Sequence, residues 1–219
     1  MLSPMATKGS ARSAGRPRDP AIDRAILAAT LAVLREHGYR GFSLEAVATR
    51  AGTTKPSIAR RWPRRQELII AALVTVLVTP PVPDTGCTRC DLIAGVELLA
   101  DALLHRVPAG VLAPLLAECA TDQALHGHLI GTLVQPVRDA VAVTVTRAVG
   151  RGHLRPGLDV EHVVDLLASL VFQASLLGEA RFTASQAAEF VDLLLAGIAV
   201  DFAELVAISK ATPRKHRHR

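Results

Sequence analysis

The chain has 219 residues, of which half are apolar and only 3% are aromatic, so it can bury a substantial core in one elongated domain or two small ones. Abundant Ala and Leu favour helices, and three cysteines are too few for a disulfide framework and fit a reducing cytoplasm. The first residues lack the apolar stretch of a secretory signal, and the most apolar run, 68–78, is too short to span a membrane. We therefore expect a soluble, cytoplasmic protein with no membrane partner.

Charge is distributed unevenly along the chain. Residues 1–78 contain thirteen Lys or Arg against five Asp or Glu, whereas residues 79–205 contain seven against fifteen. Residues 206–219 contain five basic residues and no acidic one. A basic first third joined to an acidic body indicates one surface that binds nucleic acid and a body that stays away from the phosphates.

The first 18 residues have no apolar periodicity and are expected to form a flexible basic arm. Residues 1–13 fit a solvated tail equally well. Arg16 and Arg18 lie directly before the first predicted helix, where arginines of a mobile arm can enter the negative potential of a minor groove. These two arginines are therefore predicted DNA contacts.

The stretch from Ser43 to Trp62 predicts two short helices joined by a tight turn. Ser43 and Thr54 are suitable N-caps, and Gly52 can adopt the left-handed conformation that ends a helix. Ile58 and Trp62, four residues apart, form the inward face of the second helix and leave small, polar and basic residues facing outward. A short helix, a glycine turn and a basic helix form a helix-turn-helix that recognises DNA.

The remaining chain predicts further helices separated by Pro- and Gly-containing connectors. Asp19 and Pro20 begin the first helix, which ends at Gly38. Pro136 lies within a predicted helix and removes one hydrogen bond, so we expect a kink or break near 131–135. The other helices are predicted at 63–79, 91–105, 109–120, 122–149, 159–177 and 183–207.

The last two predicted helices are apolar on more than one face. A helix that is apolar nearly all round is buried on both sides, and in a small helical body a second copy of the protein can cover the outer side. The other interpretation is that both helices form the centre of a monomer. The interface predicted for a homodimer comprises Val164, Leu167, Val171, Phe190, Leu194 and Ile198.

Several segments together resemble the TetR family of bacterial transcriptional regulators. In the first third they are Gly15-Arg-Pro-Arg18, Glu36-His-Gly-Tyr39 and the segment 43–68, which contains Arg61-Trp-Pro and Glu67-Leu68. In the second half, Gly150-Arg-Gly-His-Leu-Arg-Pro156 followed by Asp159 is similar to a TetR ligand-binding domain. The resemblance covers most of residues 15–205.

The resemblance implies an all-α fold of about nine helices, with a three-helix head and a C-terminal bundle for ligand binding and dimerisation. Its implied partners are double-stranded DNA with a palindromic operator, a second copy of the chain and a small-molecule effector that changes the separation of the heads. We predict no cofactor and no metal-binding residues. The predicted domains are a flexible basic arm at 1–18, a helix-turn-helix DNA-binding domain at 19–66, a ligand-binding and dimerisation domain at 67–207, and a basic disordered tail at 208–219.

The family's DNA contacts can be carried over onto matching positions of this chain. Lys55 is the candidate for a guanine edge, Pro56 for a thymine methyl, and Arg60 for a base or a phosphate. Arg61, Arg64 and Arg65 are expected to bind phosphates, as are the two serines at the helix starts. An ordinary helical hairpin would not explain four arginines within 60–65. The predicted DNA-binding residues are Arg16, Arg18, Ser43, Thr54, Lys55, Pro56, Ser57, Arg60, Arg61, Arg64 and Arg65.

One position departs from the family pattern. Ala59 stands where the family usually has Tyr, which commonly contacts the DNA backbone. The alanine loses that contact, and Arg60 and Arg61 can compensate electrostatically. The departure affects the details of docking and not the prediction that the chain binds DNA.

The effector is predicted from the composition of the body. Its pocket walls should be mostly Leu, Val, Ala and Ile, which suits a lipophilic or aliphatic ligand. A ligand of this kind would release a repressor from its operator. The predicted lining residues are Glu118, His126, Phe172 and Gln173.

Two alternatives to a ligand-released repressor remain open. One is a helical architectural protein that binds DNA without an effector. The other is a metal or redox sensor, since Cys87 and Cys90 have the spacing of a zinc or redox pair, although no second pair of ligands accompanies them. Because no nucleophile elbow, phosphate loop or paired-carboxylate motif occurs, we do not predict an enzyme.

Overall fold

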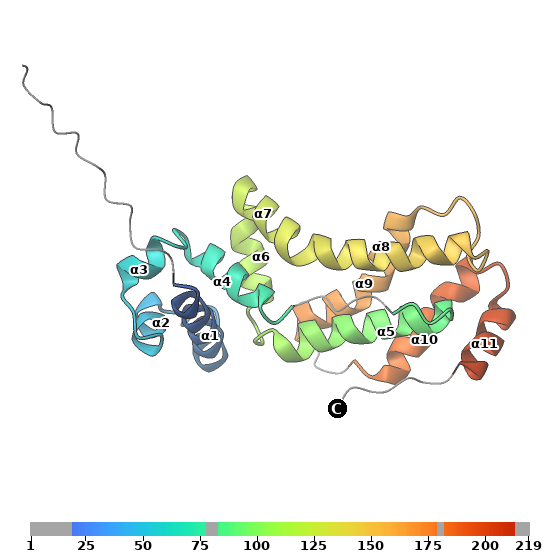
Figure 1. Ribbon diagram of the computed structural model, residues 1–219, viewed down its shortest axis with the longest axis horizontal. Helices are drawn as coiled ribbons and strands as arrows, with labels where there is room; N and C mark the ends of the chain where they lie inside the picture. The colour runs from blue at the N-terminus through green and yellow to red at the C-terminus, as the bar shows by residue number, and fades with distance from the viewer. Residues whose placement is uncertain (1–18, 78–82, 179–181, 213–219) are drawn as a thin grey trace, which may run out of the picture.

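The computed structural model describes residues 19–77, 83–178 and 182–212. Within these ranges the protein has eleven α-helices, two π-helical segments and one isolated antiparallel bridge. Figure 1 shows a small head at one end of an elongated helical body. The all-α prediction is confirmed, and the chain is broken into more helices than the nine or so expected.

The head (residues 19–74) consists of helices of 5 to 18 residues whose starts are fixed by side-chain caps. Asp19 Oδ1 accepts a hydrogen bond from Ala21 N at 2.9 Å, and Ser43 Oγ accepts one from Glu45 N at 3.2 Å. Each cap satisfies an N–H group that the first helical turn leaves without a partner. The helices are α1 (Pro20–His37), α2 (Leu44–Arg50), α3 (Lys55–Ala59) and α4 (Arg65–Val74), the last of which leads into the body.

The head has a closed apolar core. Helix α1 packs against α2 and α4, and the side chains of Ile26, Ile58 and Leu68 are fully buried between them. Burying an apolar side chain of this size contributes about 1.5–3 kcal/mol, so these three residues fix the relative positions of the head helices. The core therefore holds α3 in one orientation.

The body (residues 75–77, 83–178 and 182–212) is built around α5 (Thr88–Ala100), which packs against α8, α9 and α10. Helices α5 and α8 run roughly lengthwise in Figure 1, and α11 lies at the end farthest from the head. The elements are α5 (Thr88–Ala100), the π-helical segment η1 (Asp101–Arg106), α6 (Leu112–Ala120), α7 (Gln123–Leu129), the π-helical segment η2 (Ile130–Val134), α8 (Gln135–Gly150), α9 (Val160–Leu177), α10 (Ala184–Ile198) and α11 (Phe202–Ala211).

The break predicted before Pro136 is present. Segment η2 separates α7 from α8, and Pro136 is the second residue of α8, where its missing N–H costs little. The wider π-helical turn accommodates the change between the two α-helices. Because η2 also packs against α4, the break lies where the body meets the helix that leaves the head.

The helix predicted at 183–207 is two helices in the structure. Helix α10 ends where Ile198 O accepts a hydrogen bond from Arg155 N at 3.0 Å, in the loop after α8. Asp201 then caps α11. The second helix extends to residue 211, so the first part of the predicted disordered tail at 208–219 is helical, and 213–219 lie outside the described residues.

By length and composition alone, α9 is apolar enough to cross a membrane. The core helix of a soluble protein passes the same test, and α9 buries Val163, Val164, Leu167 and Val171 against the body. Its hydrophobicity is therefore explained by packing on one side and by the exposed face described below on the other.

Candidate nucleic-acid interface

The turn between α2 and α3 has the geometry that the sequence predicts. Gly52 has a φ of +63°, in the left-handed region that favours glycine. Thr54 Oγ1 accepts a hydrogen bond from Ser57 N at 3.4 Å and caps α3. With Ile58 fully buried beneath it, α3 presents its other side to solvent.

The outward side of α3 carries the candidate DNA-contacting residues. Lys55, Pro56, Ala59 and Arg60 are exposed. Lys55 Nζ lies 2.7 Å from Glu45 Oε2, but their side chains are 52% and 74% exposed, so the pair stabilises little and can be exchanged for a contact with DNA. The surface is small, polar and basic, as a major-groove helix requires.

Two neighbouring arginines have different environments. Arg60 is exposed and makes no ion pair with another described residue. Arg61 is only 11% exposed: its Nε lies 2.5 Å from Asp23 Oδ1, and its Nη1 donates to Ser57 O at 3.0 Å. Arg61 therefore ties the end of α3 to α1. The structure gives no support to its predicted role as a phosphate contact.

The other two arginines predicted to bind phosphates face the body. Arg64 Nη1 lies 2.7 Å from Asp122 Oδ2, at the start of α7. Arg65 Nη2 donates to Glu118 Oε1 at 2.6 Å, and its guanidinium lies 4.9 Å from the centre of the Tyr39 ring. Both arginines hold the head against the body, although the Arg64 pair remains half exposed.

Glu118, near the end of α6, is the centre of this junction. Besides Arg65, it accepts hydrogen bonds from Tyr39 Oη and Gln66 Nε2, each at 2.7 Å. The hydrogen bond from Tyr39 holds the pKa of Glu118 below its usual value, and Gln66 and Arg65 act in the same direction against the effect of burial. Burial and the carboxylate of Glu118 raise the pKa of Tyr39, so the phenol keeps its proton and remains a donor.

A cavity of about 110 Å³ lies inside the body. Its walls are formed mainly by leucine, valine and alanine from η1, α5, α6, α8 and α9, with Phe172 from α9. Polar lining is sparse. The carboxylate of Asp91 accepts hydrogen bonds from the backbone and side chain of Thr85, and Arg106 and Arg138 are paired with acidic side chains.

Thr144 is the exception among the lining residues. Its side chain belongs to α8, the residue is 5% exposed, and its Oγ1 has no hydrogen-bond partner among the described residues. A buried hydroxyl without a partner costs about 1–3 kcal/mol. Sequence reasoning missed this residue, although Val137, Val141 and Thr144 lie at helical spacing and line one wall together.

Of the four predicted lining residues, Phe172 lines the cavity and the other three do not. Glu118 points to the head, as described above. His126 is exposed on α7. Gln173 lies in a shallow depression on the outer side of α9 and α10. The sequence argument failed here because the side of each helix that faces inward depends on packing with distant segments.

The predicted dimer residues divide between two faces. Val164, Leu167 and Val171 are buried in the protomer's own core, so they cannot form the outer face. Phe190, Leu194 and Ile198 are partly exposed. The apolar outer face of α9 and α10 instead includes Leu166, Leu170, Leu177 and Leu193, of which Leu193 is 76% exposed.

Two of the predicted DNA-binding residues belong to the basic arm. Arg16 and Arg18, the two predicted minor-groove contacts, lie outside the described residues. The remaining predicted DNA-binding residues are described, and those with an exposed or half-exposed position on the outward side of the head are Ser43, Thr54, Lys55, Pro56, Ser57 and Arg60.

Comparisons with known proteins identify the two parts of the chain separately. The family model described as "Bacterial regulatory proteins, tetR family" matches residues 26–72. The model described as "Tetracyclin repressor-like, C-terminal domain" matches residues 82–194. The first match covers the helix-turn-helix, and the second covers most of the body that contains the cavity.

Individual relatives agree with the family models. The DNA-binding transcriptional repressor TetR of Mycobacteroides abscessus is 32% identical over 176 residues, which cover 80% of this chain and 87% of that protein. The uncharacterised HTH-type transcriptional regulator YdeS of Bacillus subtilis is 30% identical over 164 residues, covering 74% and 82%. The crystal structure of the TetR family transcription regulator SCO0332 superposes with a TM-score of 0.63 at 26% identity, covering 80% of this chain and 97% of that one.

Regulators of this family are generally soluble, cytoplasmic, DNA-binding proteins without enzymatic activity, and typically act as homodimers. The exposed α3, the closed head and the helical body fit this description. With both family models matched in order along the chain, the protein belongs to the TetR family and is a helix-turn-helix transcriptional regulator.

Proposed function

We propose that the protein is a homodimeric repressor that a small, largely apolar ligand releases from a palindromic operator. The position of α6 carries this proposal. Leu112 and Leu116 of α6 line the cavity, while Glu118 on the same helix accepts hydrogen bonds from three residues of the head. A ligand that displaces α6 therefore displaces the contact that holds the head.

The operator is bound by the outward side of α3. Lys55 donates to guanine O6 and N7, Pro56 contacts a thymine methyl, and Arg60 binds a base or phosphate at the far end of the short helix. Ser43 and Ser57 are near the starts of α2 and α3, where N–H groups favour phosphate oxygens. Arg64 can exchange Asp122 for a phosphate, because its ion pair is half exposed.

The second copy covers the outer face of α9 and α10. Leu166, Leu170, Leu177 and Leu193 are all exposed, and Leu170 and Leu193 line the same depression between α9 and α10. Exposed apolar side chains that lie together mark interaction surfaces. When this face packs against the same face of a second protomer, both protomers contribute the same residues to the interface. The two α3 helices would then enter successive major grooves about 34–36 Å apart.

The ligand is mostly apolar and carries one hydrogen-bonding group. The predominantly leucine and valine walls favour an apolar ligand, and the Thr144 hydroxyl supplies the one buried donor without a partner among the described residues. The cavity is smaller than the engineered cavity of about 150 Å³ that holds benzene. A ligand of about seven or more heavy atoms therefore pushes the lining helices apart, α6 included.

A DNA-release experiment tests the proposal. An operator is first selected from random DNA with the purified protein, and its complex is followed by fluorescence anisotropy during titration with methyl hexyl ketone. We expect the wild type to release the operator. The variant Glu118→Ala should bind the ketone, measured by calorimetry, but release less DNA, because the cavity is then disconnected from the head.

Two outcomes would contradict the proposal in different ways. If no palindromic sequence is selected, the protein does not act as a dimeric sequence-specific repressor. If a palindrome is selected but neither ketones nor n-octane bind, the effector-independent alternative is favoured. The cavity argues against that alternative, because a body with a purely structural role would be expected to fill its core.

A further inference from the structure

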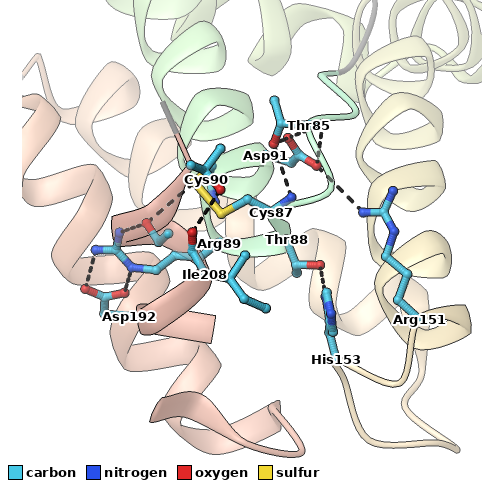
Figure 2. The surroundings of a disulfide bond; sticks show 12 residues. Thr85, Cys87, Thr88, Arg89, Cys90, Asp91, Arg151, His153, Asp192 and Ile208 are labelled. Atoms are coloured by element: carbon cyan, nitrogen blue, oxygen red, sulfur yellow. Dashed lines mark hydrogen bonds and ion pairs between the residues drawn. A yellow bond between two sulfur atoms is a disulfide. The ribbon is translucent and has the colours of Figure 1, made fainter. Parts of the chain in front are cut away.

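The first turn of α5 contains a pair of cysteines that DNA recognition does not use. Cys87 is the N-cap of α5, and it is joined by a disulfide to Cys90, one turn further on (Figure 2). Cys87 Sγ also accepts a hydrogen bond from Cys90 N at 3.2 Å. Cys87 is buried, whereas Cys90 is partly exposed, so Cys90 is the more exposed residue of the pair.

The residues between and beside the cysteines connect α5 to three other parts of the body. Arg89 makes a two-pronged contact with Asp192 of α10, at 2.5 and 2.8 Å. Thr88 Oγ1 lies 2.8 Å from His153 Nδ1 in the loop after α8. Arg89 Nη1 also donates to Ser209 of α11 at 2.9 Å. Figure 2 shows Arg89 directed toward Asp192 and Thr88 toward His153 from the same helical turn.

The same turn forms one end of the cavity. Asp91 and Leu92 follow Cys90 directly and line the cavity, and Gly95 and Val96 continue its wall along α5. Asp91 N donates to Cys87 O at 2.9 Å, so the backbone at the cavity end is bonded to the cysteine that caps the helix. The cysteine pair and the cavity-lining residues Asp91 and Leu92 therefore belong to adjoining turns of one helix.

We propose that Cys87 and Cys90 form a redox pair that senses hydroperoxides and sets the rigidity of the cavity end of α5. Two cysteines at the start of a helix, three residues apart, are placed where the N–H groups favour thiolate. Disulfides in cytoplasmic proteins are usually transient and serve catalysis or redox sensing. Among the described residues no group of three or more His, Cys, Asp or Glu could hold a metal ion, so redox chemistry accounts for the pair better than metal binding does.

The reaction balances with a hydroperoxide as the oxidant. The Cys90 thiol loses its proton to water, and the thiolate attacks the outer oxygen of ROOH. The S–O bond forms as the O–O bond breaks, which leaves a sulfenic acid on Cys90 and an alkoxide that takes up a proton from water to give ROH. The Cys87 sulfur then attacks the Cys90 sulfur, forms the S–S bond and releases water. Two thiols and ROOH become one disulfide, ROH and water, and a cellular dithiol can reverse the process by exchange.

The third cysteine provides an internal reference. Cys119 is a free thiol, fully buried in α6, and burial raises the pKa of that thiol. It should therefore resist hydroperoxides while the pair reacts. Oxidation of the folded protein is expected to remove two thiols and leave one.

The proposal is tested on the full chain by two measurements. Protein reduced with dithiothreitol is treated with tert-butyl hydroperoxide, denatured, alkylated with iodoacetamide and analysed by mass spectrometry. We expect the number of alkylated cysteines to fall from three to one, with Cys119 retained and no crosslinked dimer. Hydrogen exchange should then show at least about fivefold faster exchange in the peptide covering 87–96 for the reduced form, with peptides from α1 to α3 unchanged.

Matched variants separate this chemistry from general oxidation. Cys119→Ser should retain both responses, and the double variant Cys87→Ser with Cys90→Ser should lose both. In Cys87→Ser, dimedone should trap a sulfenic acid on Cys90. Any of three results would overturn the proposal. They are three alkylated cysteines after peroxide treatment, an intermolecular disulfide, and equal rates of hydrogen exchange at 87–96 in the reduced and oxidised forms. None of these readouts depends on DNA or ligand binding, so they stand independently of the repressor hypothesis.

Discussion

The apolar core of the head is completely packed, whereas the apolar core of the body contains a cavity. In the head, Ile26, Ile58 and Leu68 are packed with no exposed surface, and even Arg61 is held by Asp23 and Ser57. The body also buries many leucines and valines, but it leaves a cavity of about 110 Å³ and a hydroxyl without a partner among the described residues.

This difference separates a part that must keep its shape from a part that can change. Close packing resists small displacements, so α3 can present the same surface to DNA each time. An apolar cavity lowers the cost of rearranging the helices around it, because contacts there are already missing. The junction at Glu118 joins the two, and the predictions below test each side of the comparison in turn.

The largest effect is expected from opening the closed core of the head. Ile58→Ala should lower the free energy of unfolding by about 2–5 kcal/mol, because it removes a fully buried side chain that the packing around it cannot replace. Chemical denaturation measures the loss. The matched variant Ile22→Ala, at an exposed position of α1, should cost much less; equal costs would show that the head is not packed as described.

A smaller effect is expected on the surface that this core supports. Lys55→Ala should weaken operator binding by about 1–3 kcal/mol and relax specificity at one base position, with stability unchanged. Anisotropy with a panel of single-base operator variants provides the measurement. Equal weakening on every sequence would instead identify Lys55 as a phosphate contact.

In the body, removing the buried hydroxyl of Thr144 should stabilise the protein, whereas truncation in the head core destabilises it. Thr144→Val should raise the free energy of unfolding by up to about 1–3 kcal/mol, since valine has a similar shape and no donor to desolvate. Affinity for methyl hexyl ketone should fall, while affinity for n-octane should hold or rise. Thr146→Val, on the exposed side of α8, is the matched control. A destabilised Thr144→Val would mean that the hydroxyl has a partner in solution.

Partial filling of the cavity should be tolerated. An added Cβ at Gly95 meets no atom within 4 Å, so Gly95→Ala should gain about 0.5–1 kcal/mol from helix propensity while it reduces the space for a ligand. Gly127→Ala, in α7 and away from the cavity, should gain stability by the same mechanism without affecting the ligand. Calorimetry with both variants separates the two effects.

The smallest effect is expected from acid at the junction. The pKa of Glu118 is lower in the folded protein than its ordinary value of 4.5, so its contribution is complete above pH 4.5 and is lost as the pH falls through the folded value. The pKa of Tyr39 is raised above its ordinary value of 10.0. The stability that the neutral phenol contributes to the fold is therefore complete below pH 10 and is lost as the pH rises through the folded value. The fall in melting temperature from pH 6 to pH 3 should be smaller in Glu118→Gln than in the wild type. An equal fall would show that the junction does not depend on the charge of Glu118.

Local features of the fold were readable from the sequence because each depends on neighbours in the chain. Caps such as Ser43 and Thr54 act within three residues, and the break before Pro136 follows from one missing N–H. The helix-turn-helix was recognised for this reason. The same reasoning placed Lys55, Pro56 and Arg60 on the outward side of α3, where the structure has them.

The errors concern contacts between distant segments. Arg61 meets Asp23, 38 positions away, and Arg65 meets Glu118, 53 positions away, and nothing near either arginine in the chain indicates these partners. Each residue of a helix is rotated by about 100° from the one before it, so neighbouring apolar residues of α9 point in different directions. The sequence analysis assigns Val164 and Leu167 to the outer face, but the structure buries them and exposes Leu166 and Leu170 there. Periodicity shows that a helix has two apolar faces but does not show which one the protomer covers.

The shortness of α3 limits how precisely one protomer can address a gene. A helix of five residues can touch only a few base pairs, and so short a sequence recurs by chance throughout a chromosome. Against roughly 10⁶ or more competing sites, a lone head would be titrated away from its target. A dimer requires two such sequences at a fixed spacing, so the probability of a chance match is the product of the two separate probabilities. In the proposed dimer, the leucines of α9 and α10 would therefore determine how few places in the genome the regulator occupies, although they do not contact DNA themselves.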